Sequence, residues 1–405
     1  MLNKSTKWLA IAGSLLLSAT AVFAQDSKAL LDALIAKGIL TADEAKAISA
    51  EAKKTAPVFA QPGKVVSKIS LGARVQVQYA GISTDIDNTA NDPASTNHFF
   101  LRRIYLVTKA NLGPDWSMNI TYDPSEQLFD AAMITYKKDD YSVDVGLRKA
   151  PLGYEELTSS GSLKAIERTG VTRYFVEPNN GRRLGASGYR VGVFASGQSG
   201  NFVYSAAITN PERVDSSSSN GNAGNNQQAY WVNGGFKGKH KDGSYNFGAA
   251  AGWLPNQGGK TVGTGYDLTI YSIYGDVSMG DFQLVGEYLT ADVERGASAT
   301  QDANPYGYWL QASYKVNQQF EAVARFSHLD SDGRGVNIGD GVRSAPSGGT
   351  HDKLTEYFVG GNWYIKGNDL KFQAGYVYGE SKDTVTGGTA GATASGVRSM
   401  MQLNF

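Results

Sequence analysis

Apolar and polar side chains alternate with a period of two along most of the chain after residue 68. In the stretch 69–79, for example, Val75 falls on the apolar face and Arg74 on the polar face. Such alternation predicts β-strands that have one apolar face. We expect sixteen strands, over residues 69–79, 98–112, 116–123, 129–137, 141–148, 187–196, 201–209, 229–240, 244–254, 266–278, 281–291, 305–316, 319–329, 353–366, 369–379 and 396–405.

Short and long connections alternate between these stretches. Residues 138–140 and 241–243 are brief turns, whereas 149–186 and 330–352 are long, and only 124–128 breaks the rule. Transmembrane barrels have short periplasmic turns and long external loops. An even number of strands also returns the last strand to the first, so that no strand edge faces lipid. The predicted fold is an all-β transmembrane barrel of 16 antiparallel strands.

This barrel is predicted to span residues 65–405. With sixteen strands it would be wide enough for a water-filled channel. Aromatic residues gather near the strand ends, where they would form the girdles that face outer-membrane lipid. These residues are Trp116, Tyr122, Tyr136, Tyr141, Tyr230, Trp253, Tyr306, Tyr314, Tyr364, Tyr378 and Phe405. The predicted location is the bacterial outer membrane.

The first residues carry the pattern of an export signal. Lys4 and Lys7 form a basic start, Trp8–Leu17 is an apolar run, and Val22–Ala24 is a small-residue cleavage pattern. This predicts a signal peptide over residues 1–24. The alternative is a membrane anchor, but the apolar run is shorter than the ~20 residues that a spanning helix needs.

A short α-helical segment is predicted next, over residues 25–54, as a periplasmic leader. Thr41–Glu44 has the capping-box pattern that starts a helix. A Pro-containing linker follows over residues 55–64. The leader is either an association module or a loosely ordered extension, and the pattern leaves both open.

Composition and charge narrow the partners. Removing residues 1–24 takes away two lysines and changes the formal net charge from +0 to −2, so no global field favours nucleic acid. The alternation of positions along each strand nevertheless places eleven cations but five anions on the polar strand faces. This excess predicts a positive lumen and an anion preference. Charged lumens also occur in unselective channels. The cations are Arg74, Arg103, Lys109, Arg148, Arg190, Lys237, Lys239, Lys315, Arg325, Lys371 and Arg398, and the anions are Asp123, Asp144, Glu287, Glu321 and Glu356.

The long connection 149–186 lacks the alternation and carries six cations and four carboxylates. We expect it to fold into the barrel as a constriction loop, with its carboxylates orienting arginines rather than meeting solute. Arg182 and Arg183 are the strongest candidates for oxyanion contacts, because the planar guanidinium fork suits phosphate-like ligands. The full set of candidates for the constriction and anion site is Arg148, Lys149, Lys164, Arg168, Arg173, Arg182, Arg183, Arg74, Arg103 and Arg190.

Two other functions remain open from the residues. A general or sugar-permeable porin could use Trp231, Trp309 and Tyr105, which take lumen parity, as a stacking track. An outer-membrane barrel enzyme is a remote alternative, since the four histidines are scattered and neither HExxH nor GxSxG occurs. We predict no enzymatic activity, no metal and no cofactor.

Several motifs resemble those of the phosphate-selective porin O and P family. They are Leu101–Leu106, Pro151–Ser160, Ile166–Arg168 and Arg183–Gly185. The resemblance implies a homotrimer of sixteen-stranded outer-membrane porins whose third external loop narrows the pore. It also implies passive passage of phosphate or related oxyanions along an arginine ladder, to which Arg74, Arg103, Arg148 and Arg190 could belong.

Overall fold

The structure is a computed structural model in which two compact units, Met1–Gln61 and Pro62–Phe405, are distinguished. It describes residues 34–37, 41–44, 66–89, 91–178, 180–212, 227–257, 265–295, 302–385 and 390–405. The predicted signal peptide, at 1–24, and linker, at 55–64, lie outside these residues. Among the residues described, no helix has the length and apolar character needed to cross a membrane.

The described part of the predicted leader is helical at residues 34–36 and 42–44. The amide of Glu44 donates to Thr41 Oγ1 at 3.2 Å, and Glu44 Oε2 accepts from the amide of Thr41 at 2.8 Å. This reciprocal pair is the capping box that the sequence pattern indicates.

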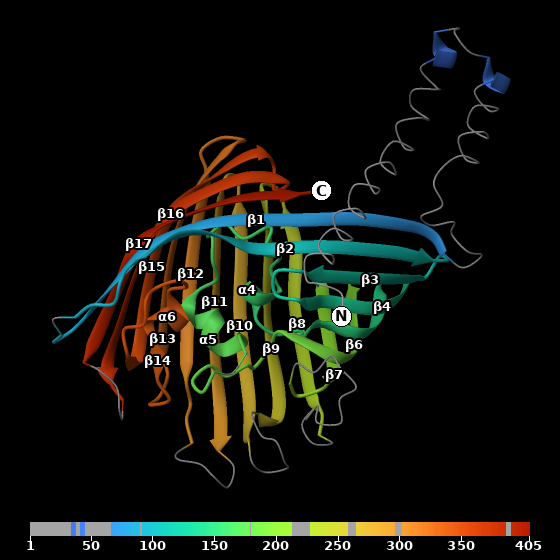
Figure 1. Ribbon diagram of the computed structural model, residues 1–405. Helices are drawn as coiled ribbons and strands as arrows, with labels where there is room; N and C mark the ends of the chain where they lie inside the picture. The colour runs from blue at the N-terminus through green and yellow to red at the C-terminus, as the bar shows by residue number, and fades with distance from the viewer. Residues whose placement is uncertain are drawn as a thin grey trace, which may run out of the picture. The chain divides into compact units, whose positions relative to one another are not determined.

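Residues after 65 form one closed antiparallel barrel (Figure 1). Sixteen strands make up its wall, as predicted, and the two-residue β14 adds a short pairing beside β15. The barrel closes between β1 and β17, where Ala73 and Phe405 exchange two backbone hydrogen bonds of 3.0 Å. The strands are β1 (Val66–Ile86), β2 (Thr96–Leu112), β3 (Trp116–Asp123), β4 (Leu128–Lys138), β5 (Tyr141–Lys149), β6 (Tyr189–Ser199), β7 (Phe202–Thr209), β8 (Ala229–His240), β9 (Gly243–Gln257), β10 (Tyr266–Met279), β11 (Phe282–Arg295), β12 (Tyr306–Lys315), β13 (Phe320–Asp330), β14 (Val336–Asn337), β15 (Thr350–Lys366), β16 (Leu370–Thr384) and β17 (Gly391–Asn404).

The outer face of the wall is apolar and exposed, and the inner face is polar. Val359 and Ile273 are more than half exposed on the outside, whereas Glu287 and Lys371 are buried inside. This is the reverse of a soluble protein and fits a wall that faces lipid. The prediction that Tyr364 belongs to a girdle is wrong. This side chain points inward, where its hydroxyl donates to Glu321, because alternation along β15 turns Trp363 outward instead.

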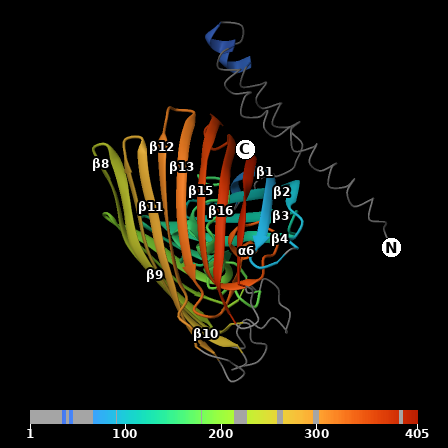
Figure 2. The ribbon, with the colours of Figure 1, turned by 90° about the vertical axis from the view of Figure 1, so that its left-hand side faces the viewer.

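The wall is uneven in height (Figure 2). β3 and β7 have 8 residues each, whereas β15 has 17. Since β3 pairs only with Leu106–Leu112 of β2, residues Thr96–Tyr105 have no strand partner on that side within the described chain. An unpaired strand edge leaves backbone donors and acceptors to be satisfied by something else.

Three short helices lie on loops rather than in the wall. α4 (Tyr154–Leu157) and α5 (Gly170–Val176) belong to the connection between β5 and β6, and α6 (Ile338–Gly341) to the connection between β13 and β15. We call residues 150–188 the inner loop and residues 331–349 the second loop. Thr169 caps α5, since its hydroxyl accepts from the amide of Thr172 at 3.0 Å.

Candidate functional site

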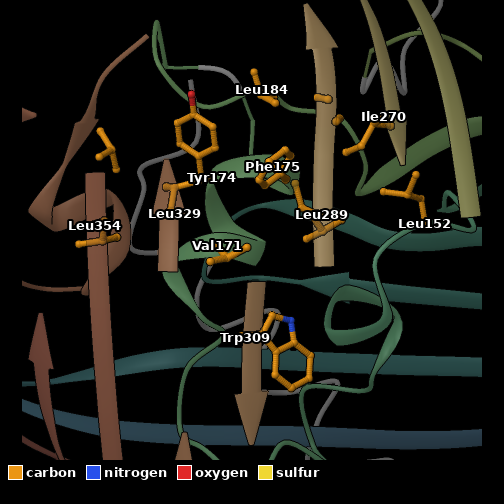
Figure 3. Close-up of a cluster of buried hydrophobic side chains, with 14 of the residues drawn as sticks. Leu152, Val171, Tyr174, Phe175, Leu184, Ile270, Leu289, Trp309, Leu329 and Leu354 are labelled. Carbon is orange, nitrogen blue, oxygen red and sulfur yellow. The ribbon is translucent and has the colours of Figure 1, made fainter. Parts of the chain in front are cut away.

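The inner loop lies inside the barrel because its apolar side chains pack against the inner face of strands β10 to β15. Figure 3 shows this cluster, in which α5 faces strands β10 to β15. Gly170 allows the close approach: a Cβ at this position would lie 2.7 Å from Leu354 Cδ2 and 2.8 Å from Gly341 Cα. The side chains labelled in the cluster are Leu152, Val171, Tyr174, Phe175, Leu184, Ile270, Leu289, Trp309, Leu329 and Leu354.

Buried charges fix the inner loop to the same wall. Arg325 of β13 pairs with Glu155 at 3.1 Å and with Glu356 of β15 at 3.2 Å, and all three side chains are at most 5% exposed. Glu287 of β11 accepts from the amides of Tyr154 and Glu155, which begin α4. The buried charges at these contacts are therefore paired, which favours one well-defined position of the loop.

The tip of the inner loop contacts further strands of the wall, among them β1 and β16. Gln76 of β1 donates to the carbonyl of Ser160 at 3.2 Å, and Lys371 of β16 donates to the carbonyl of Leu163 at 2.9 Å. Lys164 pairs with Glu321 of β13 at 2.5 Å. The loop therefore crosses the lumen and is held on several sides.

A cavity of about 930 Å³ remains between the inner loop, the second loop and the wall formed by β1 to β6. Nine cationic side chains but five carboxylates line it, so the cavity is more positive than the chain as a whole. The cations are Arg74, Arg102, Arg103, Lys109, Lys149, Arg168, Arg173, Arg190 and Arg343, and the carboxylates are Asp130, Glu156, Glu167, Glu177 and Glu212.

A β-bulge in β2 places two adjacent arginines in this cavity. Gln76 pairs with Arg103 and Val77 with Leu101, so Arg102 is the extra residue. A bulge interrupts the alternation of sides. Both Arg102 and Arg103 therefore face the lumen, while Leu101 points outward and is 54% exposed.

The carboxylates of the inner loop are neutralised by arginines, as the sequence predicts. Glu167 accepts two bonds from Arg102, at 2.6 and 3.0 Å, and one from Arg343 at 3.1 Å. Glu177 pairs with Arg173 at 3.1 Å and also with Arg183 and Arg343. Every carboxylate of the loop is thus engaged by a cation, since Glu156 binds Lys149 and Arg168, and Glu155 binds Arg325.

These pairs keep Glu167 and Glu177 ionised. Burial acts to raise the pKa of Glu177, but the charges of Arg173 and Arg343 outweigh it and bring this pKa to about 2. Burial likewise acts to raise the pKa of Glu167, whereas Arg102 and Arg343 hold it well below its usual range. At neutral pH the site is therefore a network of formed ion pairs with a surplus of cations.

Arg74 and Arg103 supply much of that surplus. Arg74 donates to Asn404 and Ser160, both at 2.8 Å, and Arg103 donates to Gln76 at 2.9 Å. Neither arginine forms an ion pair with a carboxylate among the residues that the structure describes. Neutral acceptors orient a guanidinium without cancelling its charge, so both remain able to attract an anion.

The structure brings together six of the ten predicted site residues. Arg74, Arg103, Lys149, Arg168, Arg173 and Arg190 line the cavity.

The other four lie outside its lining. Arg148 pairs with Asp144 and covers Phe194, and Lys164 is bound to Glu321. Arg182 and Arg183, the strongest candidates from the sequence, are bound to Asp340 and Glu177 and do not line the cavity. Arg182 is turned toward Asp340 of the second loop, and Arg183 toward Glu177 within the inner loop.

Sequence reasoning missed Arg102, Lys109 and Arg343 as site residues. Lys109 had the correct parity and could have been included on that ground. Arg102 enters through the bulge, and Arg343 enters through a loop that the sequence predicts to be external. No local pattern marks either feature.

The predicted aromatic track does not form. Trp231 is 1% exposed and donates to Thr209, and Trp309 is 4% exposed and donates to Glu287. Only Tyr105 of the three lines the cavity, and the guanidinium of Arg74 lies over its ring at 5.5 Å. The two tryptophans instead fill space between the wall and the inner loop.

A family model described as phosphate-selective porin O and P matches residues 69–265 and 246–405. The chain belongs to this family. It is therefore an outer-membrane porin, located in the bacterial outer membrane, as the motifs of β2 and the inner loop predict.

Solved porins share the fold at low sequence identity. The anion-selective porin from Comamonas acidovorans is 14% identical, with a TM-score of 0.55 and coverage of 84% of this chain and 99% of that one. The outer membrane channel DcaP of Acinetobacter baumannii is 11% identical, with a TM-score of 0.53 and coverage of 84% and 97%. OmpT of Vibrio cholerae, in a trimer form, is 11% identical, with a TM-score of 0.50 and coverage of 84% and 99%. A comparison with curated protein sequences finds no match.

Proposed function

We propose that this porin is a passive channel for small anions, with phosphate or related oxyanions as preferred solutes, and that it catalyses no reaction. The observation that carries the proposal is the surplus of cations on the cavity wall, with Arg74 and Arg103 held by neutral acceptors. When charges of one sign are in excess at a narrow point, they select the sign of the permeating ion.

The cationic side chains that line the cavity are the proposed solute-binding residues. Arg102 and Arg103 present adjacent guanidinium groups from one strand, and Arg74 lies on the neighbouring strand. Oxyanions accept several hydrogen bonds at once, which favours a cluster of planar donors. The inner loop narrows the path, so a permeating anion passes close to this cluster.

The sign of the selectivity is tested on the wild-type protein in planar bilayers. Under a KCl gradient we expect the reversal potential to lie on the chloride side of zero, because the cavity is lined by more cations than carboxylates. Phosphate added to one side is then expected to reduce the chloride current, since it competes for the same arginines.

Different results would point elsewhere. A potential on the potassium side would contradict the anion channel. An anion preference without phosphate block would indicate a general anion porin, and release of fatty acid from phospholipid would indicate an enzyme.

We further propose that the porin is a homotrimer. The unpaired edge Thr96–Tyr105 and the exposed side chains of Phe99, at 75%, and Leu101 support a contact with a second copy of the chain. The solved OmpT of Vibrio cholerae in its trimer form has a similar barrel.

Replacing Phe99 by Ser is expected to lower the fraction of trimer in mild detergent. Burying one such side chain contributes about 1.5–3 kcal/mol, and three copies of the contact would be lost per trimer. Light scattering coupled to size-exclusion chromatography measures the mass. Ile273, on the outer face of β10 and 62% exposed, is the matched control, and an equal loss of trimer in Ile273→Ser would contradict this interface.

A further inference from the structure

The second loop enters the barrel and packs against the inner loop. α6 contacts α5 and the strands β15, β16 and β17. Arg173 of the inner loop donates to the carbonyl of Gly341 at 2.7 Å, and Arg182 pairs with Asp340 at 2.7 Å. Two inward loops, rather than one, therefore border the cavity.

The second loop is also fixed to the wall beyond α6. Thr96 of β2 donates to the carbonyl of Ser344 at 2.7 Å, and Thr84 of β1 donates to the carbonyl of Pro346 at 2.8 Å. A capping box at Asn337 and Asp340 orders the start of α6. These bonds hold the backbone around Arg343 without using its side chain.

Arg343 is the residue that the second loop delivers to the cavity. Its guanidinium binds Glu167 at 3.1 Å and also binds Glu177, and so links two carboxylates of the inner loop. Glu167 and Arg343 are 176 residues apart in the sequence. A planar guanidinium has five donors and can serve two carboxylates at once.

We propose that Arg343 is a specificity-determining residue of the channel, which sets the anion preference by holding Glu167 and Glu177 away from the permeating ion and by adding its own charge. The inference rests on the proposed anion channel and extends the selectivity filter to a second loop. Two features separate this role from loop stability. The loop has its own anchors at Thr84, Thr96 and Asp340, and each glutamate keeps another arginine when Arg343 is removed.

The test compares the chloride-to-potassium permeability ratio of full-length variants in planar bilayers. Arg343→Gln removes the charge but keeps hydrogen-bonding groups, and we expect the ratio to fall about threefold. Arg343→Lys restores the charge, but one ammonium group cannot bridge both carboxylates as the fork does, so its ratio should lie between those of Arg343→Gln and the wild type. Lys353→Ala removes a cation of β15 that binds Asp383 and lies outside the lining of the cavity, and its ratio should equal that of the wild type.

The measurements distinguish a failure of this inference about Arg343 from a failure of the proposed anion channel. A wild-type channel that prefers potassium would overturn the anion function itself. A wild-type channel that prefers chloride, together with an unchanged ratio in Arg343→Gln, would overturn only the role of Arg343. If Arg343→Gln forms no barrel, as judged by its heat-dependent migration in a gel, Arg343→Lys decides alone: a ratio below that of the wild type supports the role, and an equal ratio overturns it.

Discussion

Replacing Arg102 and Arg103 together by Glu is expected to abolish the anion preference of the channel. The lining of the cavity would change from nine cations and five carboxylates to seven of each. Each charge at a few Å from an ion, near a protein surface, is worth about 1–4 kcal/mol. The permeability ratio changes tenfold for every 1.4 kcal/mol, so the reversal potential in a KCl gradient should move close to zero.

The series contains its own controls. Arg102→Gln/Arg103→Gln removes two cations without adding carboxylates, and its reversal potential should lie between those of the wild type and the double Glu variant. Lys237→Glu/Lys239→Glu makes the same change of charge on β8, outside the lining of the cavity, and should leave most of the preference intact. Equal shifts in the two double Glu variants would show that net charge, rather than the bulge of β2, controls selectivity.

Arg325→Ala is expected to release the inner loop from the wall and to raise the single-channel conductance. The substitution would leave Glu155 and Glu356 buried near one another without the cation that binds both. Breaking a buried pair by removing one partner costs about 3–5 kcal/mol. The loop would then leave its packed position, because keeping it there would hold two carboxylates in a buried site without their cation. Conductance in KCl and the melting temperature measure the two effects.

An exposed ion pair provides the comparison for Arg325. Lys353 binds Asp383 at 2.7 Å near the external ends of β15 and β16, where both side chains are at least 36% exposed. Exposed pairs contribute about 0–1 kcal/mol, so Lys353→Ala should change neither conductance nor melting temperature appreciably. An Arg325→Ala channel with wild-type conductance would mean that the apolar cluster around Phe175 holds the loop without the buried charges.

The barrel could be predicted from the sequence because its pattern is local. A strand exposes alternate side chains to opposite faces, so Val75 and Arg74 reveal their sides without reference to the rest of the chain. All sixteen predicted strands are found in the wall, and Phe405 closes it against Ala73. The carboxylates of the inner loop were likewise expected to bind arginines, because the loop carries both in close succession.

Fewer residues of the cavity could be predicted from such local patterns. Arg102 faces the lumen because β1 and β2 pair with a shifted register, which no alternation within β2 reports. The sequence favours Arg182 and Arg183 as oxyanion contacts, because they are adjacent arginines directly before a strand. They bind Asp340 and Glu177 instead, and no local pattern places the loop of Asp340 near them.

The sequence by itself determined that this chain is an outer-membrane barrel with a charged loop in its third external connection, since period, connection length and composition are properties of short stretches. Only the tertiary structure decided which charges meet. Arg102, Arg343 and Glu167 come together through a bulge and two inward loops, because side chains so far apart in the sequence become neighbours only once the wall has closed around them.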